Sequence, residues 1–327
     1  MNFNDIIGQR DVTQSLLNAI RRDRIGHAWL FSGPAGIGKR MVAGIFAGLL
    51  LCGAPQGDRV CGGCQACMLY ENGSNPDFLR VAPEGASIGI DEIRRIQGDV
   101  SIKPMYSKRK VYVIENADRM TAQAQNCLLK TLEEPPPFAV ILLTVENYEA
   151  MLETVRSRVL RLNFKKNAPE EVQKAVRMRF PQAAGGLEFI TAYADGRIGV
   201  ALELAGSGEF MQLRDKTMGM LSGIKSKSLS SVLESASFFE ENKDSVELVL
   251  DIMTSYYRDL LVARETGNEN ILINSDKKDM IFINAKAYGP RKLLADIEQI
   301  GAAGRALKQN ANYQLAIDHM LIKLQED

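Results

Sequence analysis

The segment HAWLFSGPAGIGKR at residues 27–40 constrains the fold more than any other part of the sequence. A continuous apolar run leads into G-x-x-x-x-G-K, the pattern of the phosphate-binding loop that joins a buried strand to a helix. Gly33, Gly36, Gly38 and Lys39 are the glycines and the lysine of that loop. The segment therefore predicts an α/β domain in which a strand passes through this loop into a helix.

Other apolar runs extend the same pattern along the chain. They are continuous rather than alternating, as expected of parallel strands buried on both faces. With the first run at 27–32, the predicted strands are 77–81, 111–115, 140–145 and 159–164. Segments 39–51 and 90–100 between them have helical spacing. Strand alternating with helix predicts a doubly wound parallel α/β domain over residues 1–167.

The pattern changes after Asn167, where helical periodicity continues without a convincing strand. Pro169 followed by two glutamates resembles the first turn of a helix. A glycine-rich break at 206–208 and a serine- and lysine-rich stretch at 222–231 indicate a further boundary. We predict a small helical domain at 168–208 and an all-α C-terminal domain at 211–327.

Composition limits the partners and the compartment. Lys plus Arg and Asp plus Glu both number 40, so bulk charge does not argue for wrapping nucleic acid. Any DNA contact would need a local patch or partner chains. The N-terminus lacks the basic flank and apolar run of a signal peptide, and the longest apolar stretch, 41–51, is too short to cross a membrane. We expect a cytoplasmic protein with no membrane contact.

Four of the five cysteines lie close together, as Cys52, Cys61, Cys64 and Cys67. The spacing C-x8-C-x2-C-x2-C places thiolates on a tight turn, and four sulfurs without an open position suit a structural zinc ion. Unliganded thiols are one alternative, and a redox pair or an iron–sulfur cluster is another, although no redox partner motif accompanies the cysteines. We predict structural zinc, and we interpret Cys127 as a buried apolar residue outside the site.

The phosphate-binding loop departs from its pattern at the eighth position, where Arg40 replaces Ser or Thr. An arginine has no acceptor oxygen and cannot ligate Mg²⁺. A working site also needs a strand that ends in Asp, often followed by Glu, and here Glu115 and Asn116 stand there. Glu115 is one methylene longer, and Asn116 cannot act as a general base. We predict a vestigial or weak nucleotide site at Gly33, Gly36, Gly38 and Lys39 that does not use Mg²⁺; binding of ATP or ADP stays open.

Several segments together resemble one family. They are IIGQ at 6–9, HAWLFSGPAGIGK at 27–39, the four-cysteine insert, NPD at 75–77, LLKTLEEPPP at 128–137 and SRV at 157–159. In this combination the chain resembles the AAA+ clamp-loader subunits of bacterial DNA polymerase III, and within that family the delta-prime subunits. The likeness covers about the first 165 residues, and NANYQLAIDHMLIKL at 310–324 adds a weaker one.

The resemblance implies a non-hydrolysing stator in a hetero-pentameric ring with gamma/tau and delta subunits, which loads the sliding clamp on primed DNA. It implies an AAA+ domain, a helical lid and a C-terminal collar that oligomerises. The family's Ser-Arg-Cys motif appears here as Ser157-Arg158-Val159. The resemblance implies that Arg158 acts in trans as an arginine finger on the ATP of a neighbouring subunit. Val200 stands where the family's lid domain usually carries a sensor arginine.

The sequence is also compatible with two other functions. An active ATPase subunit of gamma/tau type normally keeps Lys-Thr and Asp-Glu where this chain has Lys39-Arg40 and Glu115-Asn116. An unrelated P-loop kinase would need a Mg²⁺ ligand and an acceptor site, and the sequence offers neither. We expect no ATPase activity from the isolated chain, which would still be a component of the DNA-directed DNA polymerase III holoenzyme.

Overall fold

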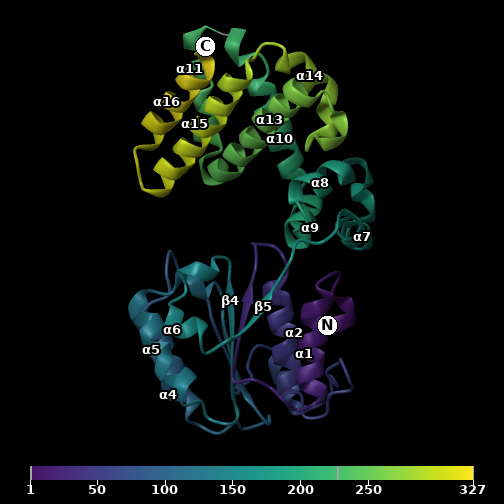
Figure 1. Cartoon of the computed structure of the whole chain (residues 1–327), viewed down its shortest axis with the longest axis vertical. Coiled ribbons are helices and arrows are strands. Elements are labelled where there is room, and N and C mark those ends of the chain that lie inside the picture. The colour runs from purple at the N-terminus through teal and green to yellow at the C-terminus, as the bar shows by residue number, and fades with distance from the viewer. Residues whose placement is uncertain (1, 227, 327) are drawn as a thin grey trace. The chain divides into compact units, whose positions relative to one another are not determined.

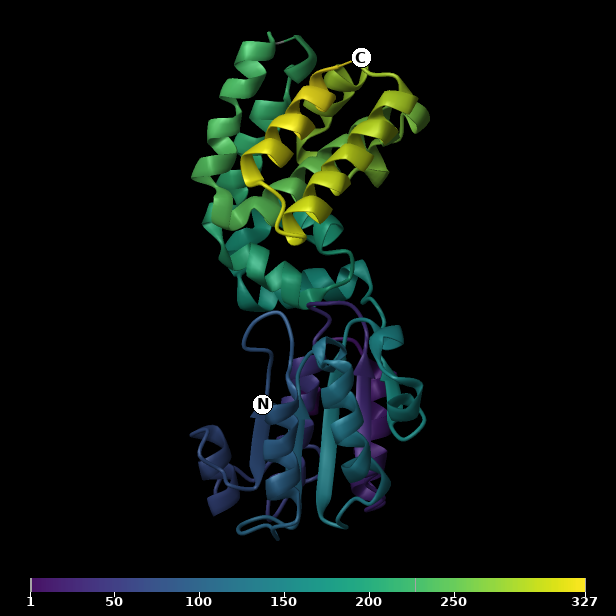
Figure 2. The same ribbon diagram turned by 90° about the vertical axis from the view of Figure 1, so that its left-hand side faces the viewer.

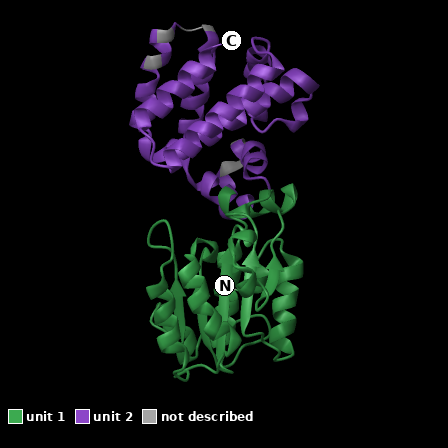
Figure 3. Ribbon diagram, turned by 60° about the vertical axis from the view of Figure 1, so that its left-hand side comes forward, with its two compact units in different colours: residues 1–175, 196–200 green, residues 176–195, 201–327 purple. Residues whose placement is uncertain are grey.

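The computed structural model describes residues 2–226 and 228–326, so Lys227 of the predicted boundary segment lies outside the described residues. The chain divides into two compact units, residues 1–175 with 196–200 and residues 176–195 with 201–327 (Figure 3). The predicted boundaries between an α/β domain, a lid and a C-terminal domain stay a prediction.

Unit 1 is built on one parallel sheet. Its strands, among the described residues, are β1 (Ala28–Ser32), β2 (Phe78–Val81), β3 (Lys110–Ile114), β4 (Ala139–Val145) and β5 (Leu160–Asn163). Their order across the sheet is β2-β3-β4-β1-β5, so β3, β4 and β1 lie inside and β2 and β5 form the edges. All five predicted strands are confirmed to within about a residue at each end.

Helices cover both faces of this sheet (Figure 1). The helices of unit 1 are α1 (Arg10–Arg21), α2 (Lys39–Leu51), α3 (Gln65–Glu71), α4 (Ile90–Val100), α5 (Ala122–Glu133) and α6 (Glu153–Arg156). One apolar core joins α1 and α2 to a face of the sheet through side chains such as Leu16, Phe31 and Phe46. A second core joins α4, α5 and α6 to the opposite face, with Ile93, Leu128 and Val155. The predicted doubly wound α/β class is confirmed.

The parallel sheet positions the candidate site, because the carboxyl ends of parallel strands meet at one edge. β1 ends at Ser32 and leads into the phosphate-binding loop. Ser32 is in register with Val145 of β4, and Ile114 of β3 is in register with Leu143 of the same strand. The residues that follow these three strands therefore converge beside the start of α2.

Unit 2 is helical. The helices after β5 are α7 (Pro169–Arg179), α8 (Leu187–Ala194), α9 (Ile198–Gly206), α10 (Gly208–Leu221), α11 (Leu229–Glu234), α12 (Ala236–Glu241), α13 (Val246–Thr266), α14 (Lys278–Ala285), α15 (Pro290–Lys308) and α16 (Tyr313–Gln325). The first residues of α7 and α9 belong to unit 1. α13 packs against α10, α14 and α15, and α15 lies beside α16 (Figure 2). The described part of this region contains no strand, as the sequence predicts.

A buried arginine accompanies the apolar core of unit 2 and reaches an exposed carboxylate. Arg214 of α10 is fully buried, donates to both carboxylate oxygens of Asp276 and to Asn274, and lies 3.7 Å from the ring centroid of Phe189. A buried charge is tolerated when it is paired and hydrogen-bonded in this way. No described helix is long and apolar enough to span a membrane.

Candidate functional site

The phosphate-binding loop turns where its glycines allow it. Gly36 and Gly38 have φ angles of 71° and 101°, which residues with a side chain rarely adopt. Lys39, the first residue of α2, is buried, and its Nζ donates to the carbonyl oxygens of Gly33 at 2.6 Å and Pro34 at 2.8 Å. Burial lowers the pKa of Lys39, and the charges of nearby carboxylates oppose that change. The loop thus has the shape of a phosphate cradle.

Gly36 is also in close contact with the start of α9. The amide of Gly199 donates to the carbonyl oxygen of Gly36 at 2.7 Å. A Cβ atom added to Gly36 would lie 2.6 Å from Cγ2 of Val200. The structure therefore places Val200, where the family resemblance implies a sensor arginine, directly against the loop with an apolar side chain.

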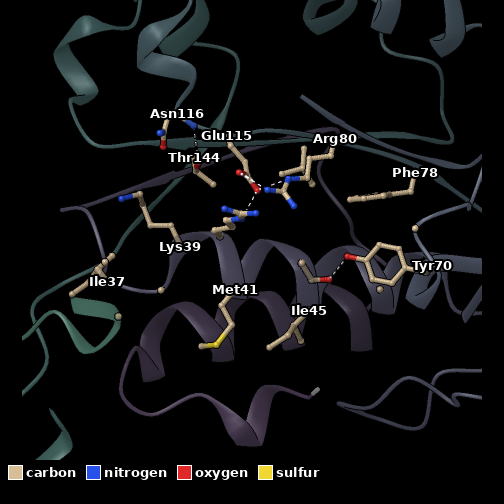
Figure 4. A pocket seen from close by; sticks show the side chains of 18 of the residues that line it. Ile37, Lys39, Met41, Ile45, Tyr70, Phe78, Arg80, Glu115, Asn116 and Thr144 are labelled. Atoms are coloured by element: carbon tan, nitrogen blue, oxygen red, sulfur yellow. Dashed lines mark hydrogen bonds and ion pairs between the residues drawn. The ribbon is translucent and has the colours of Figure 1, made fainter. Parts of the chain in front are cut away.

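An ion-pair network fills the place where a metal-ligating hydroxyl and carboxylate would stand. Nε of Arg40 lies 2.9 Å from Oε1 of Glu115, and Nε of Arg80 lies 2.8 Å from the same oxygen. Nη2 of Arg80 also donates to Oε2 of Glu115 at 3.0 Å (Figure 4). Burial raises the pKa of Glu115, and the charge of Arg40 opposes that change. Both oxygens of this carboxylate are thus engaged by guanidinium groups.

Asn116 follows Glu115 in the left-handed conformation, with φ of 48°. Its amide donates to Oγ1 of Thr144 at 3.0 Å. An asparagine side chain at the place of the usual glutamate accepts no proton from water. The two positions after β3 therefore supply neither a free metal ligand nor a general base.

A pocket of about 970 Å³ opens beside the loop. It extends from Lys39 and Asn116 past the Arg80–Glu115 pair to Tyr70 and Phe78 (Figure 4). Its lining also includes Met41 and Ile45 of α2, together with Val60 and Cys67 of the cysteine insert. The pocket therefore joins the phosphate-binding loop to the cysteine element within unit 1.

The four predicted metal ligands come together. Cys52 caps the C-terminus of α2, Cys64 precedes α3, Cys67 lies in its first turn, and Cys61 lies in the loop between the two helices. Their sulfur atoms all lie within 4.8 Å of one another. Sγ of Cys61 and Sγ of Cys67 are 4.0 Å apart. Cys127 is not part of the cluster and donates its thiol to Gln97.

The donor set fits a tetrahedral zinc ion. Four sulfurs about 2.3 Å from zinc lie roughly 3.8 Å apart, close to the separation found here. Amides also point at the sulfurs, that of Gly53 at 3.5 Å from Cys64 and that of Cys61 at 3.3 Å from Cys52. The amide of Gly53 is the main reason that the pKa of Cys64 is lowered to about 6. Such hydrogen bonds stabilise thiolates, the form that binds metal.

Arg158 follows α6 near the C-terminal end of α5. Its side chain is about one-third exposed, and its Nη2 lies 2.9 Å from Oε1 of Glu133. Its Nη1 donates to the carbonyl oxygen of Thr154 at 2.9 Å. Arg156 instead pairs with Glu149 and lies 5.1 Å from the ring centroid of Tyr148. The trans role of Arg158 stays a prediction.

The sequence did not single out three residues of these sites. Arg80 holds Glu115, Tyr70 forms part of the pocket wall, and Glu133 pairs with Arg158. Side chains two residues apart in a strand lie on the same face of the sheet. The sequence could therefore have indicated that Arg80 lies on the same face of β2 as Phe78. The other two depend on contacts between separate helices and loops.

The fold and the loop define the class of this protein as a P-loop α/β protein with a parallel five-stranded sheet. A family model described as DNA polymerase III, delta subunit, matches residues 8–168, and one described as DNA polymerase III, delta subunit, C terminal, matches residues 208–326. A DNA polymerase III subunit delta-prime of Bacillus subtilis is 30% identical over 321 residues, 97% of this chain and 96% of the relative. The chain therefore belongs to the DNA polymerase III delta-prime subunit family, and the resemblance drawn from the sequence is confirmed.

Two further comparisons concern the gamma/tau branch. A DNA polymerase III subunit tau of Bacillus subtilis is 32% identical over 321 residues, which cover 91% of this chain but only 56% of that protein. The crystal structure of a DNA polymerase III gamma subunit-related protein from Thermotoga maritima matches with a TM-score of 0.53. At 22% identity, over 96% of this chain and 98% of that one, this match shows the fold alone.

Proposed function

We propose that this chain is the stator-like delta-prime subunit of a DNA polymerase III clamp loader. It joins gamma/tau and delta subunits in a hetero-pentameric ring that loads the sliding clamp on primed DNA at the expense of ATP. Family membership over both matched regions supports the assignment. The names of the relatives, delta-prime and tau subunits of DNA polymerase III, support partners of the same kind.

The single observation that carries the non-hydrolysing role is the contact of Arg40 and Arg80 with Glu115. Phosphate-binding loops use a hydroxyl to hold Mg²⁺, and a carboxylate on a neighbouring strand completes the metal site. Here a guanidinium replaces the hydroxyl and engages the carboxylate, so a cation would have to displace two fixed charges. With Asn116 in place of a base, this site binds ATP weakly at most and does not hydrolyse it.

Arg158 is the residue through which the chain contributes to hydrolysis elsewhere. It is partly exposed and lies at a helix end, where a neighbouring subunit can approach it. An arginine supplied in trans stabilises the charge that develops during phosphoryl transfer. Its pairing with Glu133 involves two exposed side chains, and such a pair contributes only about 0–1 kcal/mol, so an incoming phosphate competes readily.

The cysteine element holds a structural zinc ion. Cys52, Cys61, Cys64 and Cys67 would be its ligands, and the ion would supply a rigid crosslink between α2 and α3. No open coordination position remains, so zinc takes no part in hydrolysis.

An active ATPase of gamma/tau type is the second candidate, favoured by the 32% identity to a tau subunit. Steady-state ATP hydrolysis by the purified chain, with Mg²⁺ and with EDTA, separates the two. The stator predicts no turnover in either condition, while the loader reconstituted with gamma/tau and delta hydrolyses ATP. Mg²⁺-dependent turnover by the isolated chain that disappears in Lys39→Ala would contradict the proposal.

A further inference from the structure

The guanidinium of Arg158 is held by its own unit at two separate nitrogens. Nη2 lies 2.9 Å from Oε1 of Glu133, the last residue of α5. Nη1 donates to the carbonyl oxygen of Thr154 in α6 at 2.9 Å and to Oγ of Ser157, the C-cap of α6, at 3.1 Å. A guanidinium is planar, so contacts at two nitrogens fix both its position and the orientation of its plane.

Glu133 differs from the other two partners of Arg158. Of these three partners, all in the described part of the chain, only Glu133 comes from another helix. Thr154 and Ser157 both contact Nη1, so without Glu133 the guanidinium could pivot about that nitrogen. The three contacts use three of the five N–H groups of the guanidinium, which leaves two for a phosphate oxygen. Glu133 thus sets the plane of the guanidinium without occupying all of its donors.

The packing of α5 against α6 determines where Glu133 lies. The two helices lie side by side and contribute to one apolar core (Figure 1). Gln125 of α5 is buried, and its Oε1 accepts from the amide of Leu152, the N-cap of α6, at 2.8 Å. Its Nε2 donates to the carbonyl oxygen of Ala150 at 3.2 Å. A side chain carried by helices that are fixed to each other in this way is placed more precisely than one on a loop.

Folding stability gives little reason for a carboxylate at position 133. Glu133 ends α5, and the partial negative charge at the C-terminus of a helix disfavours an acidic side chain there. Its ion pair with Arg158 joins side chains that are 50% and 36% exposed, and pairs of this kind add little to stability. The main consequence of the pair is therefore the orientation of Arg158.

We propose that Glu133 is a positioning residue for the arginine finger. It holds the guanidinium of Arg158 in the orientation in which a phosphate of the neighbouring subunit's ATP meets it. A side chain that is already ordered loses less conformational freedom when it binds. Glu133 can act in this way only if Arg158 acts in trans, so the inference rests on the proposed function. It gives a role to the segment LLKTLEEPPP at 128–137, to which the proposed function assigns none.

The first test measures steady-state ATP hydrolysis by the loader reconstituted with gamma/tau and delta subunits, expressed per assembled ring. Glu133→Ala should lower kcat about tenfold and leave KM for ATP unchanged, because Arg158 must then be ordered in every turnover while the neighbour still holds the nucleotide. Glu134→Ala is the matched control, since it removes an exposed carboxylate from the next position, and it should change neither constant. An unchanged kcat in Glu133→Ala would overturn the proposal. A raised kcat would also overturn it, because Glu133 would then restrain Arg158.

A conservative variant separates positioning from a general structural role. Glu133→Gln keeps an oxygen that accepts a hydrogen bond from Nη2, so it should retain most of the kcat that Glu133→Ala loses. Both variants should unfold in urea at the same concentration as the parent chain, because the exposed pair contributes little to stability. Equal losses of kcat in the two variants would overturn the proposal, since the retained hydrogen bond would then have no effect.

The Arg158→Ala background distinguishes failure of this inference from failure of the proposed function. If Glu133 acts through Arg158, Glu133→Ala should cause no further loss of kcat in that background, so the two changes are not additive. The same fold-loss in both backgrounds would mean that Glu133 acts independently, and would overturn the positioning role. If Arg158→Ala alone leaves hydrolysis unchanged, the trans role of Arg158 fails and the positioning role fails with it. If Arg158→Ala lowers hydrolysis and Glu133→Ala does not, only the positioning role fails.

Discussion

The cysteine element and the phosphate-binding loop lie at opposite ends of α2, and they differ in how much of their chemistry they keep. At the C-terminal end, Cys52 completes a set of four sulfurs within 4.8 Å of one another. At the N-terminal end, the glycines and Lys39 keep the loop, but the metal ligands are replaced by Arg40 and an arginine-bound Glu115. One end of the helix carries a complete site and the other a partial one.

The difference shows which parts of a site the fold itself requires. Gly36 must lack a side chain because Val200 leaves no room for one, whatever the loop binds. Lys39 bonds two carbonyl oxygens of the loop and so stabilises the turn in the absence of nucleotide. A hydroxyl at position 40 and an aspartate at position 115 would serve only the metal. Selection for folding can therefore preserve the loop without preserving hydrolysis.

The largest expected effect is at the complete site. Cys67→Ser should abolish stoichiometric zinc binding, because binding to such sites amounts to roughly 10 kcal/mol or more and depends on all four thiolates. Elemental analysis of the purified chain should give about one zinc ion, and the variant none. Cys127→Ser is the control and should keep its zinc, because Cys127 bonds Gln97 outside the cluster. A parent chain that folds fully without metal would contradict the structural role.

The next largest effect concerns ATP hydrolysis, to which we propose that this chain contributes through Arg158 and not through its own phosphate-binding loop. Arg158→Ala should lower ATP hydrolysis by the reconstituted loader about 100-fold or more, as expected for an arginine finger. Folding should be unchanged, because the side chain is partly exposed and its carboxylate partner is Glu133. Arg156→Ala is the control and should have a much smaller effect, since Arg156 is less exposed than Arg158, pairs with Glu149 and lies over the ring of Tyr148. Equal losses in the two variants would remove the special role of Arg158.

The sequence was most informative where the structure depends on neighbours along the chain. Continuous apolar runs located the strands, and helical spacing located α2 and α4 at their observed bounds. Strand ends differed by a residue because pairing decides them: Lys110 joins β3 through its register with Ala139. The short cysteine spacing likewise predicted a cluster that the fold does assemble.

The sequence did not predict contacts between segments that are far apart along the chain. Arg80 meets Glu115 only because β2 lies next to β3, a consequence of the strand order that no local pattern reveals. Glu133 meets Arg158 because the end of α5 approaches the end of α6. The sequence showed that positions 40 and 115 carry residues unusual for a phosphate-binding site. Only the structure showed that these two residues form an ion pair with each other.

Asp296 is a buried carboxylate with fewer charged partners than Glu115, and we expect its titration to affect stability. Asp296 of α15 bonds Lys292 at 2.7 Å, and its other oxygen has no partner among the described residues. Burial raises its pKa to about 6 from an ordinary 3.8, which corresponds to about 3 kcal/mol. The folded state thus binds this proton more tightly than the unfolded state, so the carboxylate costs stability above pH 6 and the cost disappears as pH falls toward 4.

Asp296→Asn removes that titration. Urea unfolding at a series of pH values should show the parent chain gaining up to about 3 kcal/mol relative to the variant between pH 7 and pH 4. Asp215→Asn, at a side chain 54% exposed and paired with Lys277, provides a surface control for the loss of an ion pair. A constant difference between parent and Asp296→Asn across this range would mean that Asp296 is not the source of the pH dependence.

The smallest effect concerns the ion pair that stands in the metal position. Arg40→Ala should lower the free energy of unfolding by no more than about 1 kcal/mol, because Arg40 is largely exposed and makes one contact with Glu115. Arg80 makes two contacts with the same carboxylate, so it still holds Glu115 after that change. The double variant Arg40→Ala, Arg80→Ala leaves a carboxylate that is 7% exposed without a partner and should cost roughly 3 kcal/mol, more than the two single changes together. Additive losses in urea unfolding would mean that the arginines do not act on Glu115 jointly. In that case the pairing would no longer account for the way both oxygens of Glu115 are occupied at this end of α2.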